Sequence, residues 1–243
     1  MTRLLVLFLL ALPAVAAEDA PRVLIPIVAT LTPGAYDVFW YTEISARNQS
    51  DQLAYVIVPT GASLAGLPHP FFYSLPPATT VRLDPARTEN VGVVAFLQPG
   101  SAHDVVIQER GIAEADGGCQ SAGVQIPTAR EDEFRTRLSL INIPSDDRYR
   151  VLVRIYSLTT HPLVARAHVT ADFGPTPAPA DYVVPVSAAF TRTDFASTRA
   201  MVPGYGALPL PTHASRDERI SIEINADEPV WALQASPTTR HRR

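Results

Sequence analysis

Two segments of the chain share one strand-like pattern, and this repeat is the strongest constraint on the fold. Trp40–Asn48 and Phe134–Asn142 carry an aromatic residue, a threonine, an aliphatic residue, a serine and an asparagine at the same steps. An Ile-Pro pair precedes each segment, and a Ser-Asp pair follows it. The segments start 94 positions apart (134 − 40), a spacing that suits sandwiches of about 100 residues. The repeat predicts two similar β units in tandem; a single larger sandwich, with one half from each repeat, also fits.

Apolar residues recur with the period of two that is typical of a half-buried strand. The segment from Phe134 to Ile141 places four residues on one face: Phe134, Thr136, Leu138 and Leu140. We therefore expect Thr136 and Leu138 to face a core and Arg137 to face solvent. Trp40, which occupies the position of Phe134 in the other copy, is then expected in a core as well.

Further runs rich in β-branched and aromatic residues predict an all-β chain. They are Val23–Val28, Ala54–Val58, Val91–Phe96, Val105–Gln108, Ala165–Thr170 and Val183–Val186, with Ile220–Ile224 showing clear alternation. Pro185 places its run at a sheet edge or outside the sheet, because proline cannot donate to a ladder. The 23 prolines of the chain argue against long helices.

The repeat and the turn-forming residues between strands predict a domain organisation with five parts. We expect a signal peptide over 1–17, a first β-sandwich over 18–111 and a connector over 112–121, followed by a second β-sandwich over 122–236 and a basic tail over 237–243. The second unit is longer, and we place its additional residues in a Pro-, Thr- and Gly-rich loop over 190–215. Long irregular loops of this kind are usually either functional or disordered.

The N-terminal residues have the pattern of an export signal. Arg3 precedes an apolar run from Leu4 to Leu12, and Ala14-Val15-Ala16 gives the small-x-small cleavage pattern. Export predicts a periplasmic or extracellular protein. No later segment approaches 18 uninterrupted apolar residues, so no membrane-spanning helix is predicted after cleavage.

The order of these signals resembles tandem Ig-like β-sandwich modules in exported proteins of environmental bacteria. The shared features are an opening Val23-Leu24-Ile25-Pro26, a Pro33-Gly34 turn, the Trp40–Asn48 strand, and acidic residues before Phe134-Arg135-Thr136. The resemblance covers nearly all of the chain after the signal. It implies an all-β fold of two tandem Ig-like antiparallel sandwich units, and it assigns no catalytic residues that could be carried over to this chain.

Composition excludes several classes of chemistry. The chain has no lysine, which removes Schiff-base and lysine general-base catalysis, and its formal net charge of −4 disfavours nucleic acid as a partner. Cys119 is the only cysteine, so no intramolecular disulfide can form; we expect it in a flexible connector. The six histidines and the acidic clusters lack a recognised metal spacing, and no nucleophile elbow or phosphate loop is present. We expect no cofactor, metal or catalytic residue.

The remaining candidates are residues that could contact a partner. Phe195, Met201 and Tyr205 place apolar groups in the expected 190–215 loop, and Phe71, Phe72 and Tyr73 form a dense aromatic run. We expect one ring of that run to be exposed and the other two to be packed in a core. The sequence therefore favours an exported, non-catalytic interaction or structural module with an unknown protein or glycan partner. A carbohydrate-binding module using the exposed aromatics, or a hydrolase whose site is assembled only in space, are the alternatives.

Overall fold

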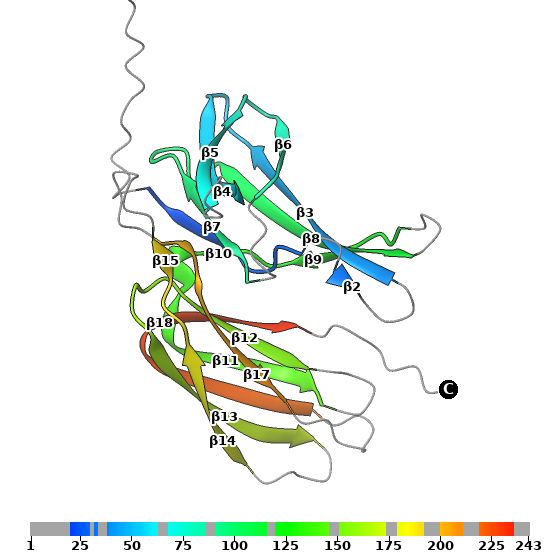
Figure 1. Cartoon of the computed structure of the whole chain (residues 1–243), viewed down its shortest axis with the longest axis vertical. Helices are drawn as coiled ribbons and strands as arrows, with labels where there is room; N and C mark the ends of the chain where they lie inside the picture. Colours follow the sequence, from blue (N-terminus) through cyan, green and yellow to red (C-terminus); the bar gives the residue numbers. More distant parts are fainter. Residues whose placement is uncertain are drawn as a thin grey trace, which may run out of the picture.

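The protein is all-β, and every strand pair in the described residues is antiparallel (Figure 1). The computed structural model describes residues 20–29, 32–33, 38–62, 68–85, 91–115, 120–145, 151–173, 179–191, 200–210 and 219–235. The expected signal peptide 1–17, Cys119, Phe195 and the tail 237–243 lie outside the described residues. Among the described residues, no helix has the length and apolar character needed to cross a membrane.

The first group of strands forms two sheets. One sheet has the order β10 (Ala129–Arg130), β1 (Arg22–Ile25), β7 (Val93–Leu97), β4 (Ala54–Ala62) and β5 (Pro68–Leu75). The other has the order β2 (Thr32–Pro33), β3 (Val38–Asn48), β8 (Val105–Ala115) and β9 (Val124–Ile126), and β6 (Thr80–Leu83) pairs with β3. We call them the β1 sheet and the β3 sheet.

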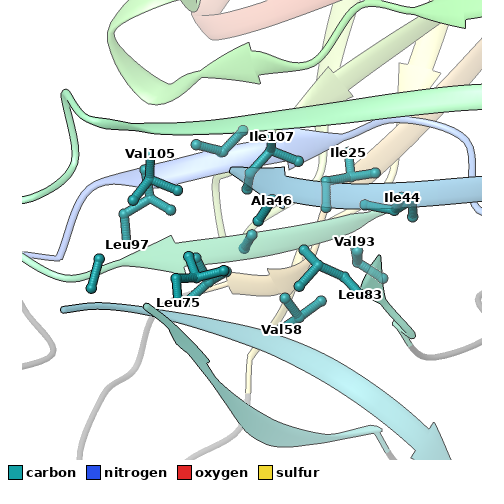
Figure 2. Packing of buried hydrophobic residues seen from close by; sticks show 14 of the residues in the cluster. Ile25, Ile44, Ala46, Val58, Leu75, Leu83, Val93, Leu97, Val105 and Ile107 are labelled. Atoms are coloured by element: carbon teal, nitrogen blue, oxygen red, sulfur yellow. The ribbon is translucent and has the colours of Figure 1, made fainter. Parts of the chain in front are cut away.

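The inner faces of these two sheets enclose one hydrophobic core. Figure 2 shows Ile44 and Ile107, from β3 and β8, on the opposite side of the core from Val58 and Leu75, from β4 and β5. Fully buried residues alternate along β4 and β3, as in Val56 and Val58 or Ile44 and Ala46, whereas β7 is buried at all five residues. The period of two in β3 and β4 therefore arises from one face that is directed into this core.

The strand order of the first group differs from the immunoglobulin order. In that order, the first strand lies in the sheet of the second and the last strand lies beside the sixth. Here β1 pairs with β7 along Arg22–Ile25, and β8 pairs with β3 along the whole of Val38–Asn48. The first group therefore does not have the immunoglobulin strand order.

The second group of strands surrounds a separate core. Its strands are β11 (Arg135–Pro144), β12 (Leu152–Ser157), β13 (Leu163–Phe173), β14 (Ala180–Val186), β17 (Gly204–Pro209) and β18 (Arg219–Ala235). The core is rich in Ile and Val, with Ile155, Ile222 and Ile224 completely buried. As expected, β14 with Pro185 is at a sheet edge. Leu138 packs against this core, whereas the Arg137 side chain is 70% exposed, so the predicted facing of both residues is confirmed.

Strand β18 is the centre of the six-stranded sheet of the second group, and its two halves pair with different neighbours. Arg219–Ala226 pairs with β13, Val230–Ala235 pairs with β12, and β11 follows it from Arg219 to Val230. The segment Asp227–Pro229 lies between the two pairing regions. One continuous strand therefore pairs with three others.

The structure changes two expected boundaries. The expected connector 112–121 starts inside β8, which continues to Ala115. Residues 122–130, expected in the second unit, contain β9 and β10, which pair with β8 and β1 of the first group. The change from the first group to the second falls at the short 3-10 turn η2 (Glu131–Glu133), which the Arg22–Glu131 ion pair ties to β1.

The stretch 190–215 was expected to be a loop, and this is wrong for its described residues. Phe190–Thr191 (β15) pairs with Ala200–Val202 (β16), and Gly204–Pro209 (β17) pairs with β12 over six residues. Leu208 and Leu210 are buried in the second core. Glycine is required here because a Cβ on Gly204 would come within 2.0 Å of the Ser187 carbonyl oxygen. Glycine, which looked like a turn residue in the sequence, therefore allows β17 to lie close to the neighbouring backbone.

The two repeated segments pair in similar ways, but their equivalent asparagines, Asn48 and Asn142, have different structural roles. β3 pairs along β8 and β11 pairs along β18, each the last long strand of its group. Asn48 is fully buried and its amide donates to the carbonyl oxygens of Gln52 and Leu75. Asn142 instead has a φ of +58° at a break in the β11 register. A second register break separates Arg135 from Arg137, so Thr136 is exposed and its expected burial is wrong.

Candidate functional site

The first candidate site is a buried polar cluster where the two groups of strands meet. The chain leaves β1 at Pro26–Ile27, and several elements contact this short segment. Thr42 on β3 donates its hydroxyl to the Ile27 carbonyl oxygen at 2.9 Å, and its Oγ1 accepts from the Ala29 amide at 2.9 Å. Tyr156 on β12 donates its hydroxyl to the Pro26 carbonyl oxygen, which links the second group to the first.

Glu109 is the buried acid of this cluster. Its position on β8 has the same parity as Val105 and Ile107, so its side chain points to the core face, and its residue surface is 0% exposed. Glu109 Oε1 accepts from the Ile27 amide at 3.1 Å, and Oε2 has no hydrogen-bond partner among the described residues. Burial raises the pKa of Glu109 to about 9, although the Ile27 amide and the Arg154 charge oppose the shift. The carboxyl is therefore protonated at neutral pH.

Two aromatic rings lie beside the ring of Tyr156. The Tyr156 ring lies 5.6 Å from that of Tyr205 and 6.1 Å from that of Trp231, between ring centres, and the Arg154 guanidinium lies 5.6 Å from the centre of the Tyr205 ring. Burial raises the pKa of Tyr156, with Arg154 opposing the shift. Leu24, Ala129 and Phe134 complete the apolar part of the cluster. The cluster can hold the two groups together, and it is closed to a substrate at Glu109.

We expect Tyr156→Phe to lower the free energy of unfolding by roughly 1–3 kcal/mol, because the buried Pro26 carbonyl oxygen loses its donor from Tyr156. Urea unfolding curves measure the change. Tyr55→Phe is the control, since Tyr55 is 40% exposed and surface changes usually stay within about 0.5 kcal/mol. Equal effects of the two substitutions would show that the Tyr156 hydroxyl contributes no stability at this junction.

The second candidate site is a group of exposed aromatic rings on β5 and β4. Phe71 and Phe72 are 50% and 55% exposed, whereas Tyr73 packs against the first core and its hydroxyl accepts from the Asp84 amide at 2.8 Å. The expectation that two of these three rings are core residues is therefore wrong. Tyr55 on β4, which sequence reasoning missed, is 40% exposed.

The rings of this site divide between the two faces of the β1 sheet. Phe72 pairs with Ile57 and Tyr55 pairs with Ser74, so Tyr55 and Phe72 are diagonal neighbours on the outer face. Phe71 contacts Tyr73 edge-on, with ring centres 4.8 Å apart, on the other face. We call Tyr55 and Phe72 the outer aromatic pair.

The structure separates the other expected contact residues. Tyr205 lies in β17 against Tyr156, where it belongs to the buried cluster instead of an exposed loop. Met201 is in β16, which contacts β7 and β4, so this hairpin lies against the outer side of the β1 sheet. Its side chain and the whole of Phe195 lie outside what the structure describes. Tyr205 is thus not brought together with Phe71 and Phe72.

Comparison with known proteins gives no relative: no family model, no curated protein and no solved structure matches the chain. Within the described residues, no group of three or more His, Cys, Asp or Glu side chains could hold a metal ion.

One feature of the sequence did indicate the buried polar cluster. Glu109 continues the buried alternation of Val105 and Ile107, and a glutamate at such a position requires a partner in the fold.

Proposed function

We propose that this chain is an exported, non-catalytic interaction module that contacts a protein partner through the outer aromatic pair, Tyr55 and Phe72. The observation that supports it is the exposure of two large rings side by side on one sheet face, with 40% and 55% of their surfaces accessible. Aromatic residues are enriched in the centres of protein interfaces, where they lose little conformational entropy on binding. Export rests on the charged start, apolar run and small-residue pattern of residues 1–17.

For the scaffold we propose two β-sandwich units in tandem, Ig-like in size and with the outer strands of the first unit exchanged between sheets. The separate cores of the two groups and the repeat of Trp40–Asn48 at Phe134–Asn142 support this. The contacts around Pro26 favour a fixed junction between the units, since they combine a buried hydrogen bond with an apolar cluster. A fixed scaffold suits a module that presents a surface.

A flat sugar-binding platform is less well supported at this site. Phe71 and Phe72 are neighbours in one strand, so they point to opposite faces of the sheet and cannot stack on one sugar ring together. Only Tyr55 and Phe72 share a face, and the nearest polar neighbour on the ladder is Ser74. Oligosaccharide sites need several placed polar groups as well as rings.

A displayed library of random peptides tests the proposed contact. Peptides selected on the immobilised protein should be apolar, and their binding should fall at least tenfold in Tyr55→Ser and in Phe72→Ser, because loss of an anchor ring costs about 2 kcal/mol or more. Val183→Ser on β14 is the matched control, since Val183 is 64% exposed on another edge strand. Peptides that bind both ring variants as tightly as the wild type would contradict the proposal.

The proposal that the protein has no catalytic activity needs a separate measurement. The purified protein should turn over no member of a panel of ester, glycoside and phosphate substrates. Turnover that persists through repurification, and that a substitution in this chain abolishes, would show an enzyme and overturn this part of the proposal.

A further inference from the structure

The outer face of the β3 sheet carries a polar groove that the proposed function does not use. The groove has a volume of about 320 Å³, within the range of small-molecule sites. Six side chains on the outer side of four neighbouring strands border it: Arg82 on β6, Glu43 and Ser45 on β3, Gln108 and Arg110 on β8, and Gln125 on β9. Ile44 and Glu109 also line it, but both residues are buried and their side chains point to the core.

Strand register aligns these side chains in two rows across the sheet. Arg82, Ser45 and Gln108 are directly opposite one another on three adjacent strands. Glu43, Arg110 and Gln125 form the next row. Opposite Cβ atoms in such ladders lie about 5 Å apart, so the guanidinium, hydroxyl and amide groups are within reach of one small ligand.

The fold positions Arg110 in particular. Gly123, at a φ of +80°, passes so close that a Cβ there would lie 2.5 Å from Arg110 Cδ. The absence of a side chain at Gly123 leaves room for the aliphatic part of Arg110 just before the start of β9. Arg110 makes no ion pair with any described residue, whereas Glu43 is 3.6 Å from Arg82. The groove therefore has two arginines and one partly exposed glutamate, and so a positive balance in a chain of net charge −4.

Aromatic residues continue the same face along β3. Tyr41 and Phe39 have the parity of Glu43, and successive residues on one face of a strand lie about 7 Å apart. Phe39 is 42% exposed. A ligand longer than one ring could therefore contact Arg110 and stack on Tyr41 at once.

We propose that this groove binds a short acidic oligosaccharide, with a uronate carboxylate on Arg110 and sugar hydroxyls on Ser45, Gln108 and Gln125. Arginine matches a carboxylate with two parallel hydrogen bonds, and amide side chains both donate to and accept from hydroxyl groups. A sugar ring offers the apolar face that stacks on tyrosine or phenylalanine. This site is distinct from the outer aromatic pair, which lies on the other sheet.

Calorimetric titration with trigalacturonate, galactotriose and triglutamate tests the class of ligand. We expect trigalacturonate to bind at least tenfold more tightly than the neutral sugar and the acidic peptide, and to bind less tightly at high salt. Arg110→Gln should weaken trigalacturonate binding at least tenfold. Arg166→Gln is the matched control, since Arg166 is an exposed arginine on the outer face of β13, and Phe72→Ser should leave this binding unchanged.

If a variant does not fold, an NMR titration of the wild-type protein with trigalacturonate still tests the proposal, because the amide signals that shift locate the binding site. Shifts should change at residues 43–45, 82, 108–110 and 125. Absence of binding, equal binding by Arg110→Gln, equal binding of triglutamate, or shifts confined to another surface would each overturn the proposal. None of these outcomes bears on the peptide selection that tests the outer aromatic pair.

Discussion

We expect Glu109→Gln to stabilise the protein increasingly as the pH rises from 5 to 8. The native carboxyl has a pKa of about 9 against an ordinary value of 4.5, so between these values the folded chain holds a proton that the unfolded chain releases. Stability then falls by up to about 1.4 kcal/mol for each pH unit, because the unfolded state binds fewer protons. Glutamine keeps the shape and the acceptor for the Ile27 amide but cannot ionise.

The measurement is the free energy of unfolding in urea at several pH values for both proteins. Near pH 5 the two should differ little, and by pH 8 the variant should be more stable by roughly 3–5 kcal/mol. Glu114→Gln, at a half-buried position of the same strand, is the control. Parallel curves for wild type and Glu109→Gln would contradict the prediction, because they would show that the folded carboxyl releases its proton at its ordinary pKa; a difference that does not change with pH reports only on the substituted amide. Titration of the carboxyl by NMR checks its pKa directly.

The second large effect should come from Gly92→Ala compared with Gly100→Ala. Both glycines have positive φ, +100° and +87°, and an alanine in that region costs about 1–3 kcal/mol. A Cβ on Gly100 would meet nothing within 4 Å, whereas a Cβ on Gly92 would lie 2.5 Å from the Ile25 carbonyl oxygen and 2.7 Å from that of Pro26. Only Gly92→Ala must displace the backbone that accepts from Tyr156.

We therefore expect Gly100→Ala to lose roughly 1 kcal/mol and Gly92→Ala to lose more than about 3 kcal/mol or to fail to fold. Urea unfolding and the yield of folded protein measure the difference. Similar losses in the two variants would mean that the Pro26 segment can move without cost and that the junction is loosely held.

Strand positions followed from the sequence wherever one face is buried and the other wet. The alternation around Leu138 and along Ile220–Ile224 predicts β11 and β18 because side chains on a strand change face at every residue. β17 was missed because its Gly204, Gly206 and Pro209 are typical of turns. Gly206 is required by β14, since a Cβ there would lie 2.7 Å from the Pro185 carbonyl oxygen, and that neighbour is distant in sequence.

The candidate sites were less predictable because each depends on register. Phe71, Phe72 and Tyr73 are adjacent in sequence, and only the pairing of β5 with β4 shows which ring joins Tyr55. The groove on the β3 sheet combines side chains from four strands, so no local motif marks it. Glu109 could be suspected from its apolar parity, but its partner Ile27 lies 82 positions away.

The 17-residue strand β18 has a consequence for the order in which the chain folds. It supplies neighbours to β11, β12 and β13, so none of these can complete its pairing before Arg219–Ala235 has been synthesised. The first group has no such dependence, since its strands end at Arg130. During synthesis the first core can close while residues 135–210 still have exposed edges, and folding that depends on such distant contacts is slow. A pause in translation before residue 219 should therefore favour misfolding of the second group alone.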